Sequence, residues 1–208
     1  GNSSSEPEQP DQPTVPSPPT DEPLTHSFED IVGSFAESSI AKLTNRSIFY
    51  GKTDRLFAPN DTMTRAEFTA VVTRALDLPK TDVKGTFRDV AIHRTWAVEA
   101  IEAATKGGIV YGKTAERFEP DVPMTRAEMT VLMMRAYDHL NGENRARTPL
   151  TYNDRGSIGR FAIEAVERAT ALGIVHGTNG SFLPERHATR AEAAVMLDRL
   201  LQKGEKER

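Results

Sequence analysis

The chain is built on one tetrapeptide that occurs three times, as Thr64-Arg65-Ala66-Glu67, Thr125-Arg126-Ala127-Glu128 and Thr189-Arg190-Ala191-Glu192. Apolar residues follow each copy at the spacing i, i+3, i+4, i+7, i+8, which is typical of a helix that buries one stripe. Threonine as the N-cap and glutamate three positions later form a capping box. Each tetrapeptide therefore predicts the start of an amphipathic helix. Capping is the role that this pattern assigns to Glu67, Glu128 and Glu192.

The arginine of each tetrapeptide has no part in a capping box. It occupies the first helical position, where the positive end of the helix dipole disfavours a cation. A bound anion would explain it, because free backbone amides and a guanidinium fork both bind carboxylate. We therefore predict anion binding by Arg65, Arg126 and Arg190. Replacing them by alanine is expected to leave folding stability unchanged or slightly higher. Arg126 is the first choice, because its repeat contains Trp96 and a full-length loop.

The tetrapeptides mark a longer repeat, because successive arginines are 61 and 64 positions apart. Each repeat opens with an aromatic residue and, two positions later, an aspartate. A helix led by an aromatic residue follows, then a turn that ends in glycine, and then a Phe-x-Pro loop before the tetrapeptide. Three units are the usual minimum for stacked repeats. We therefore predict an all-α fold of three pseudo-equivalent helix-loop-helix repeats at 25–83, 84–148 and 149–208.

Composition bounds the chain further. Residues 1–24 hold seven of the thirteen prolines and almost nothing apolar, which predicts a disordered linker. Gly1 at the head of a Ser-rich stretch is interpreted as the cut end of a fragment. The formal charge is -4, but the part after residue 27 has 26 basic and 25 acidic residues, so we expect no nucleic-acid partner. No apolar run is long enough to span a membrane. The chain has no cysteine for a disulfide or a thiolate metal site.

The repeat resembles the S-layer homology domain in three tandem copies, from about Phe28 to Leu201. The resemblance implies a pseudo-three-fold arrangement around a central bundle of the Thr-Arg-Ala-Glu helices, with binding grooves between neighbouring repeats. It also implies a module that anchors an N-terminal S-layer or exoenzyme region to a Gram-positive cell wall, and hence a secreted, wall-bound location. The implied partner is a secondary cell wall polymer that contains pyruvylated N-acetylmannosamine. The segments at 51–53 and 112–114 are Gly-Lys-Thr, where the family usually has Gly-Tyr-x-Asp-Gly.

Further candidate ligand contacts accompany the arginines. Trp96 is expected either to pack against a sugar or to lie in the core, whereas Phe35 and Phe161 are expected in the core. Lys84 lies between the first two repeats, where a groove is expected. A cap of a helix or a turn is favoured over ligand contact for Asp30, Asp89 and Asp154. The entries of the first helices offer a second set of free amides at Ser34, Thr95 and Gly159.

Catalysis has little support in the sequence. The five histidines do not recur at equivalent repeat positions and show no metal-ligand spacing, so we expect no metal and no cofactor. A catalytic pair is a unique site, whereas these features occur in threes. The sequence therefore predicts a non-catalytic glycan-binding module. Two alternatives are a glycan-degrading exoenzyme and a module for protein–protein assembly of an S-layer.

Overall fold

The computed structural model describes residues 27–90 and 95–206, so the linker predicted at 1–24 lies outside the described residues. Six α-helices and two short 3-10 helices form in this part of the chain. The α-helices are α1 (Glu37–Asn45), α2 (Arg65–Ala75), α3 (Thr95–Lys106), α4 (Arg126–Asn141), α5 (Arg160–Ala171) and α6 (Arg190–Lys206). The 3-10 helices are η1 (Glu29–Ile31) and η2 (Arg155–Ser157). No strand occurs in the described ranges, only isolated β-bridges. The all-α prediction is confirmed.

The three tetrapeptides begin α2, α4 and α6, as predicted. At α2 the Glu67 amide donates to the Thr64 hydroxyl over 3.2 Å, and the Thr64 amide donates to the Glu67 carboxylate over 3.0 Å. The same capping box is complete at α4. At α6 the Glu192 amide donates to the Thr189 hydroxyl, but the Glu192 carboxylate binds two arginine side chains. The third copy of the motif therefore differs from the other two in the use of its glutamate.

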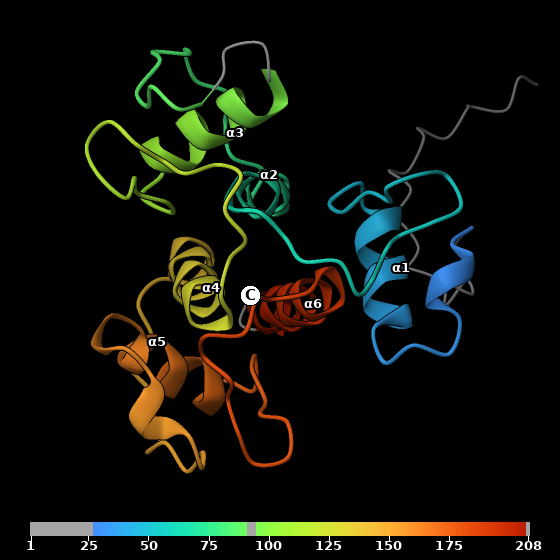
Figure 1. The fold of residues 1–208 in the computed structure, drawn as a ribbon, viewed down its shortest axis with the longest axis vertical. Helices are drawn as coiled ribbons and strands as arrows, with labels where there is room; N and C mark the ends of the chain where they lie inside the picture. Colours follow the sequence, from blue (N-terminus) through green and yellow to red (C-terminus); the bar gives the residue numbers. More distant parts are fainter. Residues whose placement is uncertain (1–26, 91–94, 207–208) are drawn as a thin grey trace, which may run out of the picture.

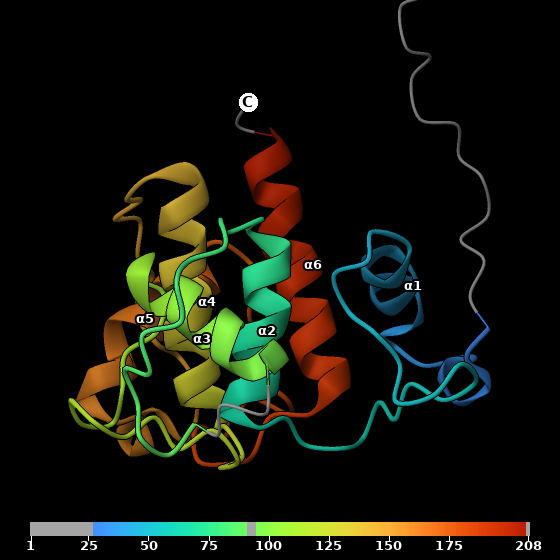
Figure 2. The ribbon, with the colours of Figure 1, turned by 90° about the horizontal axis from the view of Figure 1, so that it is seen from above.

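Each first helix packs against the second helix of the preceding repeat. The pairs are α2 with α3, α4 with α5, and α6 with α1. Figure 1 shows α2, α4 and α6 near the centre, with one outer helix beside each, and Figure 2 shows the same helices from above. Ser39 of α1 donates a 2.8 Å hydrogen bond to Asp198 of α6, which joins the first repeat to the last. The packing unit is therefore shifted by one helix from the sequence repeat.

Backbone hydrogen bonds close a ring just before the three central helices. The Met63 amide donates to the Ala188 carbonyl (3.2 Å), and the Ala188 amide donates to the Met124 carbonyl (2.9 Å). The Met124 amide then donates to the Met63 carbonyl (2.9 Å), which completes the circuit. These three residues each precede a threonine N-cap, so the ring aligns the starts of the helices. Its cyclic order supports the predicted pseudo-three-fold arrangement, which stays a prediction.

An aspartate holds the extended loop of each repeat. Both oxygens of the Asp30 carboxylate accept backbone hydrogen bonds, from Phe57 (2.9 Å) and from Ala58 (2.8 Å). Asp89 and Asp154 make the equivalent pairs of bonds with their own loops. The second amide belongs in each case to a residue with positive φ, which is a conformation that needs support in a non-glycine residue. The aspartates therefore hold these loops, and no side chain caps the starts of η1 and η2.

Candidate functional site

Three grooves occupy equivalent places around the central helices. We number each groove by the repeat that supplies its glycine turn. Groove 1 contains Tyr50 and has a volume of about 300 Å³, groove 2 contains Tyr111 and has about 270 Å³, and groove 3 contains His176 and has about 540 Å³. Each groove is also lined by the tetrapeptide glutamate of the same repeat and by two apolar residues of the central helix that contains this glutamate.

The tetrapeptide arginines lie in these grooves, but each lies in the groove of the next repeat. Arg65 lines groove 2, Arg126 lines groove 3, and Arg190 lines groove 1. Trp96 lines groove 1. The expected combination of Arg126 with Trp96 is therefore wrong, and Trp96 shares its groove with Arg190. The reason is the shifted packing, which carries the start of each central helix to the loop of the following repeat.

Each of these arginines is buried, with only 5–6% of its surface exposed, and binds loop carbonyls. Arg65 donates from Nε to the Phe118 carbonyl (2.9 Å) and from Nη2 to the Tyr111 carbonyl (3.0 Å), and its guanidinium lies over the Phe118 ring. Arg190 binds the Phe57 and Tyr50 carbonyls in the same way. Burial lowers the pKa of the Arg65 and Arg190 guanidinium groups. These side chains therefore hold neighbouring repeats together, and the expectation that alanine leaves stability unchanged does not fit this geometry.

The backbone amides at the starts of the central helices are not free, which corrects the prediction. The Arg65 amide donates to the Val122 carbonyl (3.0 Å), and the Ala66 amide donates to the Pro120 carbonyl (3.0 Å). The same bonds recur at α4 and α6 with the loops of repeats three and one. The proline of each Phe-x-Pro loop thus caps a helix of the preceding repeat. An anion in a groove would meet the guanidinium and not these amides.

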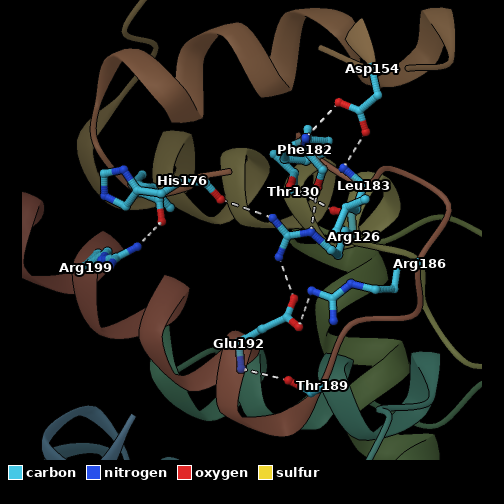
Figure 3. A network of polar contacts seen from close by, with 11 residues as sticks. Arg126, Thr130, Asp154, His176, Phe182, Leu183, Arg186, Thr189, Glu192 and Arg199 are labelled. Atoms are coloured by element: carbon cyan, nitrogen blue, oxygen red, sulfur yellow. Dashed lines mark hydrogen bonds and ion pairs between the residues drawn. The ribbon is translucent and has the colours of Figure 1, made fainter. Parts of the chain in front are cut away.

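Groove 3 differs from the other two in its charge pairing (Figure 3). Arg126 binds the Phe182 and His176 carbonyls as expected from its counterparts, and its Nη1 also donates to Glu192. Glu192 accepts a further bond from Arg186, and so holds two cations. In the described part of the chain, Arg65 and Arg190 use Nε and Nη2 for their contacts, and their Nη1 groups form no hydrogen bond or ion pair. Burial, and then the charge of Arg199, lowers the pKa of His176.

An exposed aromatic ring stands at the rim of each groove. Trp96 is 50% exposed, Phe161 is 62% exposed, and Phe35 is 75% exposed. They line grooves 1, 2 and 3 respectively. The core location expected for Phe35 and Phe161 is therefore wrong. The outer helices bury their apolar faces on the central helices, and the leading aromatic residue is left on the groove side.

A second set of arginines lines the grooves and was not singled out from the sequence. These residues follow the tetrapeptide arginines by nine positions, as Arg74, Arg135 and Arg199. The Arg74 guanidinium lies 4.8 Å from the centre of the Tyr50 ring, and Arg135 lies 4.6 Å from that of Tyr111. Burial lowers the pKa of all three guanidinium groups. Their identical offset in the three repeats was the available signal.

The remaining candidates lie outside the groove linings. The three aspartates hold loops, as described above, and Lys84 is exposed on the segment between α2 and α3. Ser34 lies in the turn before α1, where its hydroxyl accepts a bond from the Ala36 amide (3.2 Å). Thr95 is the first residue of α3, and Gly159 is the N-cap of α5. A side chain at Gly159 would collide with the Phe161 ring, with its Cβ 2.8 Å from a ring carbon.

Within 27–90 and 95–206, no group of three or more acidic or histidine side chains is arranged to hold a metal ion. None of the helices described for this chain combines the length and the apolar character needed to cross a membrane.

Comparison with known proteins identifies the repeat. The S-layer homology domain matches three segments, at 27–69, 86–130 and 151–194. The chain is 42% identical over 85% of its length to an amylopullulanase of Thermoanaerobacterium thermosulfurigenes, of which it spans 10%. It is 37% identical over 79% of its length to an endoglucanase of Bacillus sp. (strain KSM-635), of which it spans 17%. It is 31% identical over 82% of its length to S-layer protein EA1 of Bacillus anthracis, of which it spans 20%. The chain therefore belongs to the S-layer homology domain family and carries three tandem copies of the domain.

Proposed function

We propose that the chain is a non-catalytic anchoring module whose grooves bind an acidic cell-wall polysaccharide. Family membership points to cell-wall anchoring, and the S-layer and enzyme relatives are much longer proteins that share only this part. The ligand that we propose is a secondary cell wall polymer with pyruvylated N-acetylmannosamine. The protein would then attach a longer secreted protein to the envelope of a Gram-positive bacterium. The observation that carries the proposal is the threefold occurrence of a buried arginine and an exposed aromatic ring in the lining of one groove.

The groove residues suit a carboxylate-bearing sugar. In groove 1, the Nη1 group of Arg190 and the guanidinium of Arg74 would donate to the pyruvyl carboxylate, because charge-assisted bonds to a forked cation are the strongest available. Trp96 would pack against the apolar face of the sugar ring. Groove 2 offers the same set as Arg65, Arg135 and Phe161. Pre-organised cations of this kind lose little side-chain entropy when the ligand binds.

We propose that grooves 1 and 2 bind the acidic sugar more tightly than groove 3. In groove 3, the carboxylate of Glu192 already binds Arg126 and Arg186, so a ligand carboxylate would have to compete with it for Arg126. The neutral form of His176 adds no positive charge at pH 7, since its pKa is lowered. The larger volume of groove 3 does not remove this competition for Arg126.

Calorimetric titration tests the proposal. The protein is titrated with the methyl glycoside of pyruvylated N-acetylmannosamine and, as a matched control, with the same sugar without pyruvate. We expect binding of the first and at least about tenfold weaker binding of the second, because a lost charge-assisted contact costs about 1.5–3 kcal/mol. Equal affinity for the two sugars, or no binding of purified wall polymer, would refute the proposal and favour an assembly module. Release of reducing ends from the polymer would instead indicate an exoenzyme.

A further inference from the structure

A second cavity adjoins groove 1 and shares Ala70, Arg74 and Trp96 with it. Its volume is about 310 Å³, which is close to the 300 Å³ of groove 1 itself. It lies between the paired helices α2 and α3, which are neighbours in Figure 1. We call it the side cavity. The residues that line the side cavity but not groove 1 include Thr73, Asp77, Lys80, Glu99, Ala100 and Ala103.

Residue 103, which lines the side cavity, is an alanine. The same position of the first helix, seven residues after the leading aromatic, is Arg168 in α5 and Lys42 in α1. Arg168 donates from two nitrogens to the carboxylate of Asp138 on α4, and the Lys42 ammonium lies 3.8 Å from Asp198 on α6. In both of these helix pairs a basic side chain therefore bridges the outer helix to the central helix. The α2–α3 pair lacks this bridge.

An aspartate occurs at the matching sequence position, although it lies just beyond the end of α2 rather than within the helix. Asp77 follows Arg65 by twelve positions, as Asp138 follows Arg126. Asp77 is exposed, as are Lys80 and Glu99. Among the described residues, these three side chains form no ion pair with each other or with a neighbour. The side cavity therefore presents charged donors and acceptors that the fold does not use.

The charges of the side cavity balance, in contrast to those of groove 1. Asp77 and Glu99 oppose Lys80 and Arg74, so the lining has no excess of either sign. Carboxylates accept hydrogen bonds from hydroxyl groups, and ammonium and guanidinium groups donate to hydroxyl and amide oxygens. An uncharged sugar with many hydroxyl groups fits this lining better than a second acidic sugar. Trp96 joins the two spaces and is half exposed, so adjacent sugars of one chain can both contact its ring.

From this arrangement we infer that the side cavity is a second sugar subsite. It takes the neutral residue that neighbours the acidic sugar bound in groove 1. The inference rests on the proposed function and adds that groove 1 recognises at least a disaccharide. The corresponding space beside grooves 2 and 3 is bridged by Arg168 and Lys42, so those grooves recognise the acidic sugar alone. The three grooves then differ in the length of the glycan segment that they bind.

The single tryptophan of the chain makes this inference testable at one groove. Its fluorescence follows ligand binding at groove 1 and the side cavity only, since Trp96 lines both. The probes are the methyl glycoside of pyruvylated N-acetylmannosamine and a disaccharide in which this sugar is linked to one N-acetylhexosamine. We expect the disaccharide to bind about tenfold more tightly, as one or two added hydrogen bonds would produce.

Ala103→Arg is the decisive variant. It introduces at α3 the residue that α5 carries at this position, and it places a long side chain in the lining of the side cavity. We expect the variant to lose the tenfold preference for the disaccharide and to bind the monosaccharide within twofold of the wild type. Ser38→Arg is the matched control, because it adds the same side chain at an exposed position of α1, and it should change neither affinity.

Two outcomes overturn the inference while the proposed function stands. One is equal affinity of the wild type for the two probes, and the other is a disaccharide preference that survives in Ala103→Arg. If that variant does not fold, Lys80→Ala and Glu99→Ala remove the exposed polar groups without filling the cavity, and an unchanged preference in both has the same meaning. If neither probe binds any groove by calorimetry, the proposed function itself is overturned.

Discussion

Arg65→Ala is expected to destabilise the protein, because the side chain joins two repeats from a buried position. Its guanidinium binds the Tyr111 and Phe118 carbonyls at the two ends of one loop, at 3.0 and 2.9 Å. A hydrogen bond from a charged donor contributes about 1.5–3 kcal/mol, and a buried carbonyl without a partner costs about 1–3 kcal/mol. The cost of burying a cation offsets part of this. We expect the free energy of unfolding to fall by about 2–4 kcal/mol, from contacts that hold in the absence of any ligand.

Urea unfolding followed by circular dichroism measures this loss. Arg65→Lys should recover only part of it, because an ammonium lacks the fork that reaches two carbonyls. Arg88→Ala is the control, since Arg88 pairs with Glu116 across the same loop but both side chains are largely exposed. Arg88→Ala should change the free energy of unfolding by no more than about 0.5 kcal/mol. If the free energy of unfolding falls no more in Arg65→Ala than in Arg88→Ala, the buried contacts of Arg65 do not stabilise the fold. The arginine would then have a role in ligand binding alone.

Two further predictions concern acid stability and the third groove. Burial would raise the pKa of Asp89, but the hydrogen bonds from the Phe118 and Glu119 amides outweigh burial, so the pKa is lowered. The pKa of Asp154 is lowered for the same reason, by the Phe182 and Leu183 amides. A carboxyl whose pKa is lower in the folded state contributes stability above its unfolded pKa of about 4 and loses it as the pH falls. Asp89→Asn should therefore lower the urea midpoint at pH 6 more than at pH 2.5, and an equal loss at both values would contradict this assignment. Glu192→Gln should remove the carboxylate that competes for Arg126 and so raise the affinity of groove 3 for the pyruvylated monosaccharide about three- to tenfold. Calorimetric titration measures this as additional bound sugar per protein. Unchanged binding would show that the Glu192 carboxylate does not weaken groove 3.

Local chemistry was predictable from the sequence because its causes lie within a few residues. The capping boxes at Thr64 and Thr125 follow from a side chain and an amide three positions apart. The amphipathic stripe after each tetrapeptide predicts the buried face of each central helix, and residues such as Phe68 and Met129 are fully buried there. The resemblance in spacing and motif indicated the family, which the comparison shows. The equivalence of the three arginines was also visible in the sequence.

The partners of those arginines were decided only by the tertiary structure. The Arg65 side chain meets Phe118, 53 residues away, and Arg190 meets Phe57, 133 residues away. A sequence repeat shows which residues are equivalent, but not which copy they contact, because that depends on how the repeats close on one another. The same closure turns Phe35 and Phe161 outward, since each outer helix packs on the preceding repeat. Ala103 and Arg168 occupy the same position of their repeats, but only the packed helices show what each does there. Arg168 bridges α5 to Asp138 of α4, whereas Ala103 lines the side cavity.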